Sequence, residues 1–81
     1  MARTEADKAE VGVLLREARR KSGLTVMQVQ LGLLGRNRTF SEQSLRNWEK
    51  GRTMPPLTML RDMAAVLGCD VEDLIPEVEA A

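Results

Sequence analysis

The chain has 81 residues, 43% hydrophobic and 30% charged, a composition that fits one small folded domain and is too apolar for a disordered chain. It has no histidine, which excludes a histidine acid/base, a Ser-His or Cys-His nucleophile and a Cys/His zinc site, and it has no glycine-rich phosphate loop. We therefore expect neither an enzyme nor a bound cofactor or metal.

Targeting and redox features predict a cytoplasmic protein without a membrane segment. No run approaches the ~18 apolar residues of a membrane span, and the start MARTEADKAE lacks the apolar stretch of a secretion signal. Cys69 is the single cysteine, which suits a reducing compartment. Cys69 could be a reactive thiol, but a buried position is favoured.

Charge is unevenly distributed although the formal net charge is zero. Residues 16–61 hold ten bases against three acids, a balance of +7, whereas residues 62–81 hold six acids and no base. The basic middle could face an anion such as nucleic acid, or it could be ordinary solvated helix surface. Charge alone does not decide between the two.

The first two helices are indicated by caps and apolar spacing. Thr4 to Asp7 fits a capping box for a helix that ends near Gly23, and Thr25 opens a second helix that fades near Leu34. The inward positions recur at helical spacing: Val11, Leu14, Leu15 and Ala18 in the first helix, then Val26, Val29 and Leu33 in the second.

The stretch SEQSLRNWEKGR, residues 41–52, predicts a third helix with Ser41 as its N-cap and Gly51 at its end. Its two large apolar side chains, Leu45 and Trp48, stand three apart and face inward. The polar side chains of its first two turns must therefore project outward: Glu42, Gln43, Arg46 and Asn47.

Two further helices complete the prediction. Pro55-Pro56 begins a fourth helix that Gly68 closes, and Asp70 with Asp73 caps a short fifth helix over residues 71–75. The fourth helix is lined by Leu57, Leu60, Met63, Ala64 and Leu67. No strand pattern is present, so we predict an all-α, compact five-helix domain with a frayed tail at 77–81.

The outward polar face of the third helix suits the major groove of DNA, which admits one helix. The amides of Gln43 and Asn47 can pair bidentately with adenine, Arg46 with guanine or a phosphate, and Glu42 with cytosine N4. A plainer reading stays open: Glu42 can act on the helix dipole alone, and the amides can be an ordinary solvated face.

The chain resembles the Cro/repressor-type (XRE) helix-turn-helix family over about residues 8–76. The most specific match is the string Trp48-Glu49-Lys50-Gly51-Arg52 with Pro55 following, which is similar to the family's W-E-(R/K)-G…P signature. The rest of the match is carried by Leu24-Thr25, Ser41 to Leu45, Leu57, Leu60, Ala64 and Leu67-Gly68. The resemblance implies a repressor-like domain over residues 8–76, with residues 1–7 leading into it.

The same resemblance implies site residues. Base contacts fall on Glu42, Gln43, Arg46 and Asn47. Phosphate contacts fall at the start of the second helix, at the N-cap of the third and in the loop after it: Thr25, Gln28, Ser41, Lys50, Arg52 and Thr53. Glu49 is expected to pair with Arg19 in a structural role.

Three departures from the family pattern are visible. The turn before the third helix is about five residues longer than usual, with the excess at GRNRT, residues 35–39. It could be a plain surface loop, or Arg36 and Arg38 could contact phosphates or the minor groove. Gln30 stands where a small residue is usual, and Val26 where a polar phosphate ligand is common.

The function implied is a sequence-specific transcriptional regulator of phage or bacterial repressor type, bound as a homodimer to a two-fold operator with recognition helices about 34 Å apart. The dimer surface is expected at Val71, Leu74, Ile75 and Val78, unless these residues cap the core. One alternative is an antitoxin that also holds a toxin. Another is a protein-interaction adaptor that keeps the fold without DNA binding, which zero net charge, Val26 and Glu42 favour.

Overall fold

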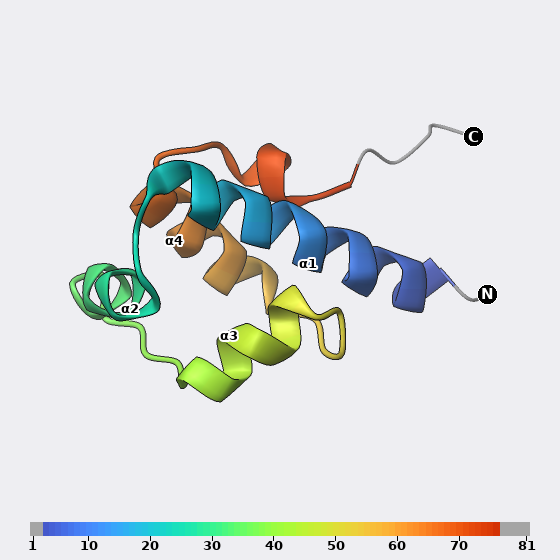
Figure 1. Cartoon of the computed structure of the whole chain (residues 1–81), viewed down its shortest axis with the longest axis horizontal. Coiled ribbons are helices and arrows are strands. Elements are labelled where there is room, and N and C mark those ends of the chain that lie inside the picture. The colour runs from blue at the N-terminus through green and yellow to red at the C-terminus, as the bar shows by residue number, and fades with distance from the viewer. Residues whose placement is uncertain (1–2, 77–81) are drawn as a thin grey trace.

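The computed structural model describes residues 3–76, with side chains from residue 8 onward, as four α-helices followed by one turn of 3-10 helix (Figure 1). These elements are α1 (Arg3–Ser22), α2 (Val26–Leu34), α3 (Glu42–Glu49), α4 (Leu57–Leu67) and η1 (Val71–Leu74). No strand occurs over residues 3–76, so the all-α prediction is confirmed there. α1 already includes Arg3, so Thr4 lies within the helix and not at its N-cap as predicted. The side chains of residues 4–7 and the tail 77–81 lie outside the described residues.

Residues 3–76 form four α-helices rather than the five predicted, because the last segment in this range is a 3-10 turn. Its start agrees with the sequence: the Asp70 N–H donates to the Asp73 carboxylate at 3.1 Å. Its end is set by Pro76. A residue before proline is pushed out of the helical region, and Ile75 is extended at φ −116° and ψ 129°. Only one turn fits between this cap and this stop.

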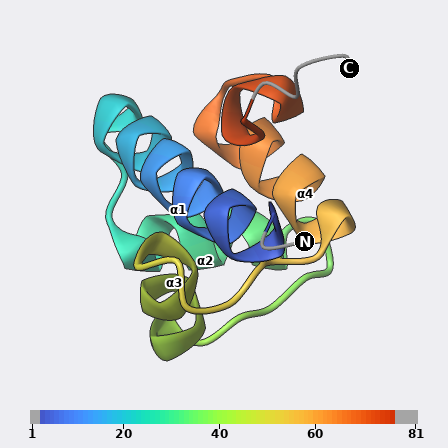
Figure 2. The same ribbon diagram turned by 90° about the vertical axis from the view of Figure 1, so that its right-hand side faces the viewer.

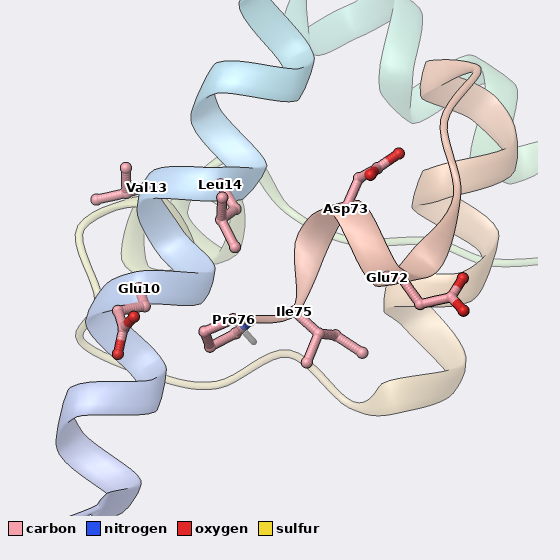
Figure 3. Close-up of a pocket in the computed structure, with 7 residues that line it drawn as sticks. All are labelled: Glu10, Val13, Leu14, Glu72, Asp73, Ile75 and Pro76. Atoms are coloured by element: carbon pink, nitrogen blue, oxygen red, sulfur yellow. The ribbon is translucent and has the colours of Figure 1, made fainter. Parts of the chain in front are cut away.

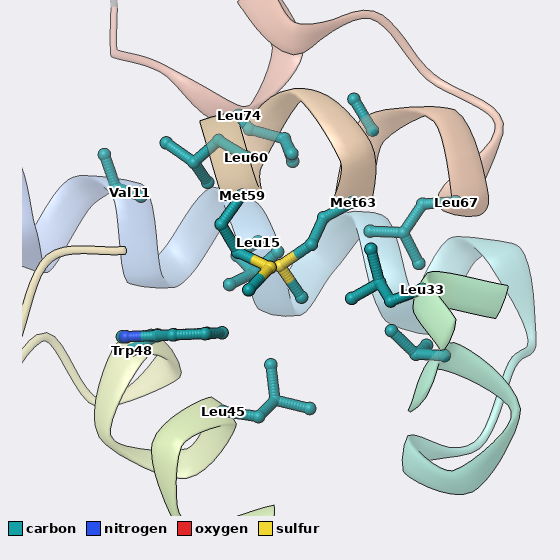
Figure 4. Close-up of a cluster of buried hydrophobic side chains, with 12 residues drawn as sticks. Val11, Leu15, Leu33, Leu45, Trp48, Met59, Leu60, Met63, Leu67 and Leu74 are labelled. Carbon is teal, nitrogen blue, oxygen red and sulfur yellow. The ribbon is translucent and has the colours of Figure 1, made fainter. Parts of the chain in front are cut away.

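One apolar core joins all five elements (Figure 4). α1 packs against α3, α4 and η1, while α2 packs against α4. Met59 and Met63 are 8% and 0% exposed within this cluster, so both methionines are core residues. The buried side chains are Val11, Leu15, Val29, Leu33, Leu45, Trp48, Met59, Leu60, Met63, Ala64, Leu67 and Leu74.

The C-terminal turn closes this core. Leu74 is fully buried, so of the residues expected either at a dimer surface or over the core, this one caps the core. Val71 and Ile75 are half-buried against the same cluster, and Val78 lies outside the described residues. The expected dimer surface therefore loses its central apolar residue.

Two glycines let α3 and its exit lie against α1. A Cβ atom on Gly12 would stand 2.5 Å from the carbonyl oxygen of Trp48 and 2.8 Å from that of Glu49. Gly51 has φ +76°, in the left-handed region that favours glycine, and a Cβ there would meet the Cα of Ala9 at 2.8 Å. The position of α3 is thus set closely by the backbone of α1.

Candidate nucleic-acid interface

The local sequence accounts for the start and the orientation of α3. The Ser41 side chain accepts a hydrogen bond from the Ser44 N–H at 3.0 Å, which confirms the predicted N-cap. Leu45 is 1% exposed and Trp48 8%, and the Phe40 ring lies 5.8 Å from the Trp48 ring, centroid to centroid. The apolar side of α3 is therefore fixed in the core, and its polar side must face solvent.

A partly buried ion pair fixes the other end of α3. Arg19 donates from Nε to Glu49 Oε2 at 2.7 Å and from Nη2 to Glu49 Oε1 at 3.1 Å, and the two side chains are 21% and 11% exposed. The hydrogen bond to Glu49 raises the pKa of Arg19, partly offset by burial. This confirms the pair expected from the family resemblance and joins the last turn of α3 to α1.

The four predicted base-contacting side chains do come together, as two pairs along the outer face of α3. Arg46 Nη2 donates to Glu42 Oε2 at 2.7 Å, and Gln43 Nε2 donates to Asn47 Oδ1 at 3.2 Å. Glu42, Gln43 and Arg46 are exposed, whereas Asn47 is half-buried. Surface pairs of this kind contribute only about 0.3–0.5 kcal/mol each, so an incoming base edge could replace them at small cost.

Most of the predicted phosphate-contacting residues are exposed, at the start of α2, at the N-cap of α3 and in the turn after α3. At the start of α2, the Gln28 N–H donates to Thr25 Oγ1 at 3.1 Å and the Thr25 N–H donates to Gln28 Oε1 at 2.9 Å, a capping box that confirms the predicted helix start. Lys50, Arg52 and Thr53 are exposed in the turn after α3.

Arg36 and Arg38, the other two predicted phosphate contacts, are held by α4. Arg36 Nε donates to Asp62 Oδ1 at 2.8 Å, and Arg38 Nε donates to Asp62 Oδ2. The hydrogen bond from Arg36, and to a lesser extent the one from Arg38, lowers the pKa of the Asp62 carboxyl below its usual range. A phosphate would have to compete with this carboxylate, so the plain-loop interpretation and the DNA-contact interpretation both remain predictions.

Sequence reasoning missed three features near the interface. In the sequence, Asp62 is one of the six acids of residues 62–81. Its pairing with Arg36 and Arg38 is a tertiary contact that the sequence alone does not indicate. Arg16 lines a hollow between α1 and α3 together with Arg46 and Lys50. An apolar stripe on α2 had a readable signal, spacing of i, i+4 and i+7: Met27, Leu31 and Leu34 are 68%, 61% and 57% exposed.

A second hollow lies away from α3, between α1 and the C-terminal turn (Figure 3). Its lining includes the apolar residues Val13, Leu14 and Ile75 and three carboxylates: Glu10, Glu72 and Asp73. The carboxylates disfavour a polyanion, so we do not include this hollow in the candidate interface.

None of the helices in residues 3–76 combines the length and the low polarity needed to cross a membrane. Cys69 is half-buried against the core, as expected for a packed rather than an exposed thiol. Burial, followed by the charges of Asp73 and Asp70, raises the pKa of this thiol.

Comparison with known proteins identifies the fold that carries this surface. A family model described as a helix-turn-helix domain matches residues 10–77, most of the chain. Neither the curated proteins nor the solved structures gave a match. The assignment indicates DNA binding in a regulatory role. The chain belongs to a helix-turn-helix domain family of the XRE-like type.

Proposed function

We propose that this protein is a sequence-specific DNA-binding transcriptional regulator, of phage or bacterial repressor type, that places α3 in the major groove. The observation that carries the proposal is the outer face of α3. Its apolar side and both of its ends are fixed by the core, the Ser41 cap and the Arg19–Glu49 pair, so its polar side is presented rigidly. A rigid helix face is what base readout requires.

Each of the four side chains on this face has a partner among base edges. Gln43 and Asn47 carry amides that match the N6 and N7 positions of adenine, and Arg46 matches O6 and N7 of guanine. Glu42 holds the Arg46 guanidinium at 2.7 Å. It would either orient Arg46 toward a base or accept a hydrogen bond from cytosine N4 itself.

The surrounding groups would position the domain on the sugar-phosphate backbone. The start of α2, with Thr25 and Gln28, offers backbone N–H groups and a helix dipole to one phosphate. Ser41 lies at the N-terminus of α3, and Lys50, Arg52 and Thr53 lie just beyond its C-terminus. These contacts would contribute affinity that falls with salt but little sequence preference.

We further propose a homodimer on a two-fold operator, with recognition helices about 34 Å apart. The support is the size of the reading face. One helix of eight residues contacts only a few base pairs, and doubling the site by symmetry is the usual way to gain selectivity.

The proposal is tested by fluorescence anisotropy with random duplex DNA and with DNA flanking the protein's own gene, at two salt concentrations. We expect tighter binding to the flanking DNA. Gln43→Ala and Asn47→Ala should reduce that preference, while Thr58→Ala, an exposed site on α4, should not. Arg52→Ala should lower the salt slope by about 1. No binding to either duplex at low salt would sink the proposal.

A protein partner is the second candidate function, and the apolar stripe on α2 favours it. Met27, Leu31 and Leu34 are all more than half exposed on a helix that carries no charged residue. Such a face suits an antitoxin that holds a toxin, or an adaptor. The adaptor alone predicts that Arg46→Ala and Arg52→Ala leave partner binding and every DNA titration unchanged.

A further inference from the structure

The two helices of the helix-turn-helix motif are each placed mainly by a different helix. α3 packs mainly on α1, and α2 packs mainly on α4. The segment between them runs below α4 in the view of Figure 2 before it reaches α3. This segment, the α2–α3 loop (residues 35–41), connects two helices that are placed by different neighbours, so its own conformation depends on the contacts that fix it.

The α2–α3 loop is fixed at both of its ends by local contacts. The Arg36 and Arg38 N–H groups both donate to the Leu33 carbonyl at 2.9 Å, and Asn37 between them has a left-handed φ of 64°. Nearer α3, Gln30 Nε2 donates to the Phe40 carbonyl at 3.1 Å. These bonds shape the loop and join it to α2, but none of them joins it to α4.

Asp62 supplies that missing connection. Its side chain is 18% exposed, and each of its two carboxylate oxygens accepts a hydrogen bond from a different loop arginine. Arg36 and Arg38 are themselves 48% and 35% exposed. Without this partner, both would be surface guanidinium groups that any phosphate could bind. Such contacts are the same for every DNA sequence, so they would add affinity without specificity.

We propose that Asp62 is a positioning residue for DNA recognition: it fixes the α2–α3 loop on α4 and withholds Arg36 and Arg38 from non-specific phosphate binding. The carboxylate thereby raises the ratio of specific to non-specific affinity in two ways. It keeps the α2–α3 loop in one conformation beside the reading helix, and it reduces the charge that any DNA sequence can use. This role rests on the proposed DNA-binding function.

The test compares Asp62→Asn with Glu72→Gln, which removes the same charge from an exposed site on η1. This turn lies away from the α2–α3 loop in both Figure 1 and Figure 2. Each variant is titrated at 50 and 200 mM salt with two probes, random duplex DNA and the DNA that flanks the protein's own gene. The second probe serves as the specific duplex. For Asp62→Asn, each arginine released should steepen the salt slope by about 0.9. Raising the salt from 50 to 200 mM should then lower the affinity for random DNA roughly 3.5-fold more, for each released arginine, than it does in the wild-type protein. The specific-to-random ratio should fall as well.

Two further variants separate the parts of the proposal. Asp62→Glu keeps the charge and should restore most of the ratio and the wild-type slope. Adding Arg36→Gln and Arg38→Gln to Asp62→Asn should remove the extra slope. If Asp62→Asn changes the ratio and the slope no more than Glu72→Gln does, the inference is wrong even though the wild-type protein binds DNA.

A measurement without DNA keeps the inference testable if the DNA-binding proposal itself fails. Amide hydrogen exchange at residues 35–41 should accelerate in Asp62→Asn and remain unchanged in Glu72→Gln, while exchange in the core of α1 stays slow in both. Equal exchange in the loop of both variants would overturn the positioning role directly. Failure of the wild-type protein to bind any duplex would instead refute the proposed function.

Discussion

Replacing Gly12 by alanine should push α3 away from α1. The new methyl group would stand 2.5 Å from the Trp48 carbonyl oxygen, about 0.9 Å inside the 3.4 Å at which ordinary contact begins. The obstructing atoms are backbone rather than flexible side-chain ends. They belong to the last turn of α3, which the Arg19–Glu49 pair holds against α1. The strain cannot be relieved without moving the reading helix.

The size of the effect follows from two opposing contributions. Forcing an extra methyl into a close-packed contact costs typically ~1–3 kcal/mol. Alanine, however, is favoured over glycine in a helix interior by about 1 kcal/mol. The net loss of stability should therefore be ~1–2 kcal/mol, because a contact this short lies toward the upper part of the range. For a domain of this size that corresponds to a decrease in Tm of roughly 5–15 °C.

Thermal unfolding followed by circular dichroism measures this effect, and Gly35→Ala is the matched control. Gly35 has a right-handed φ of −62°, and a Cβ there would meet its nearest atom at an ordinary 3.4 Å. The control should be neutral or slightly stabilising. A Gly12→Ala protein that melts at or above the wild-type temperature would refute the account of how α1 places α3.

Three further predictions concern ionisable groups. Glu49→Gln leaves Arg19 partly buried without a charged partner. It should lower the free energy of unfolding, measured in urea, by ~2 kcal/mol, which is less than the roughly 3–5 kcal/mol lost when a fully buried pair is broken. A loss no larger than that caused by Arg46→Gln, on the exposed pair, would contradict this. Because the pKa of Cys69 is raised, its alkylation at pH 8 should be slower than that of a free cysteine and should recover on unfolding. Because the folded-state pKa of Asp62 is lowered, its contribution to stability is complete above the unfolded value of about 4 and is lost as pH falls below it. Exchange in the α2–α3 loop, corrected for intrinsic rates, should therefore accelerate as the pH falls below about 4.

The helices and their caps could be predicted because their causes are local. Thr25 and Ser41 cap groups three residues away, and the apolar residues of α1, α3 and α4 repeat at the helical period. The reading face followed from the same periodicity, since burying Leu45 and Trp48 leaves the opposite side of α3 to solvent. The predicted fifth helix, residues 71–75, is instead one turn of 3-10 helix, because only one turn fits between the Asp70 cap and the extended Ile75 before Pro76.

The contacts that place the site could not be predicted, because their causes are separated in sequence. Asp62 lies 24 residues from Arg38 and 26 from Arg36, and its charge seemed to belong to the acidic end of the chain. Gly12 has no sequence signal at all, since its role appears only where the carbonyl groups at the end of α3 approach α1. The Arg19–Glu49 pair was expected only through the family resemblance.

Zero net charge, which first seemed to disfavour DNA, is consistent with binding once the charges are placed. Several bases are neutralised within the fold, at Glu49 and at Asp62. The acidic turn η1 lies at the end of the molecule away from α3 in both Figure 1 and Figure 2. The exposed bases that remain near α3 can therefore steer that face toward DNA, while a low overall charge limits binding at random sites. A regulator of this kind would depend on its base contacts more than on general electrostatic attraction to DNA. For this reason, the change in sequence preference caused by Gln43→Ala and Asn47→Ala, rather than affinity alone, decides between the proposed functions.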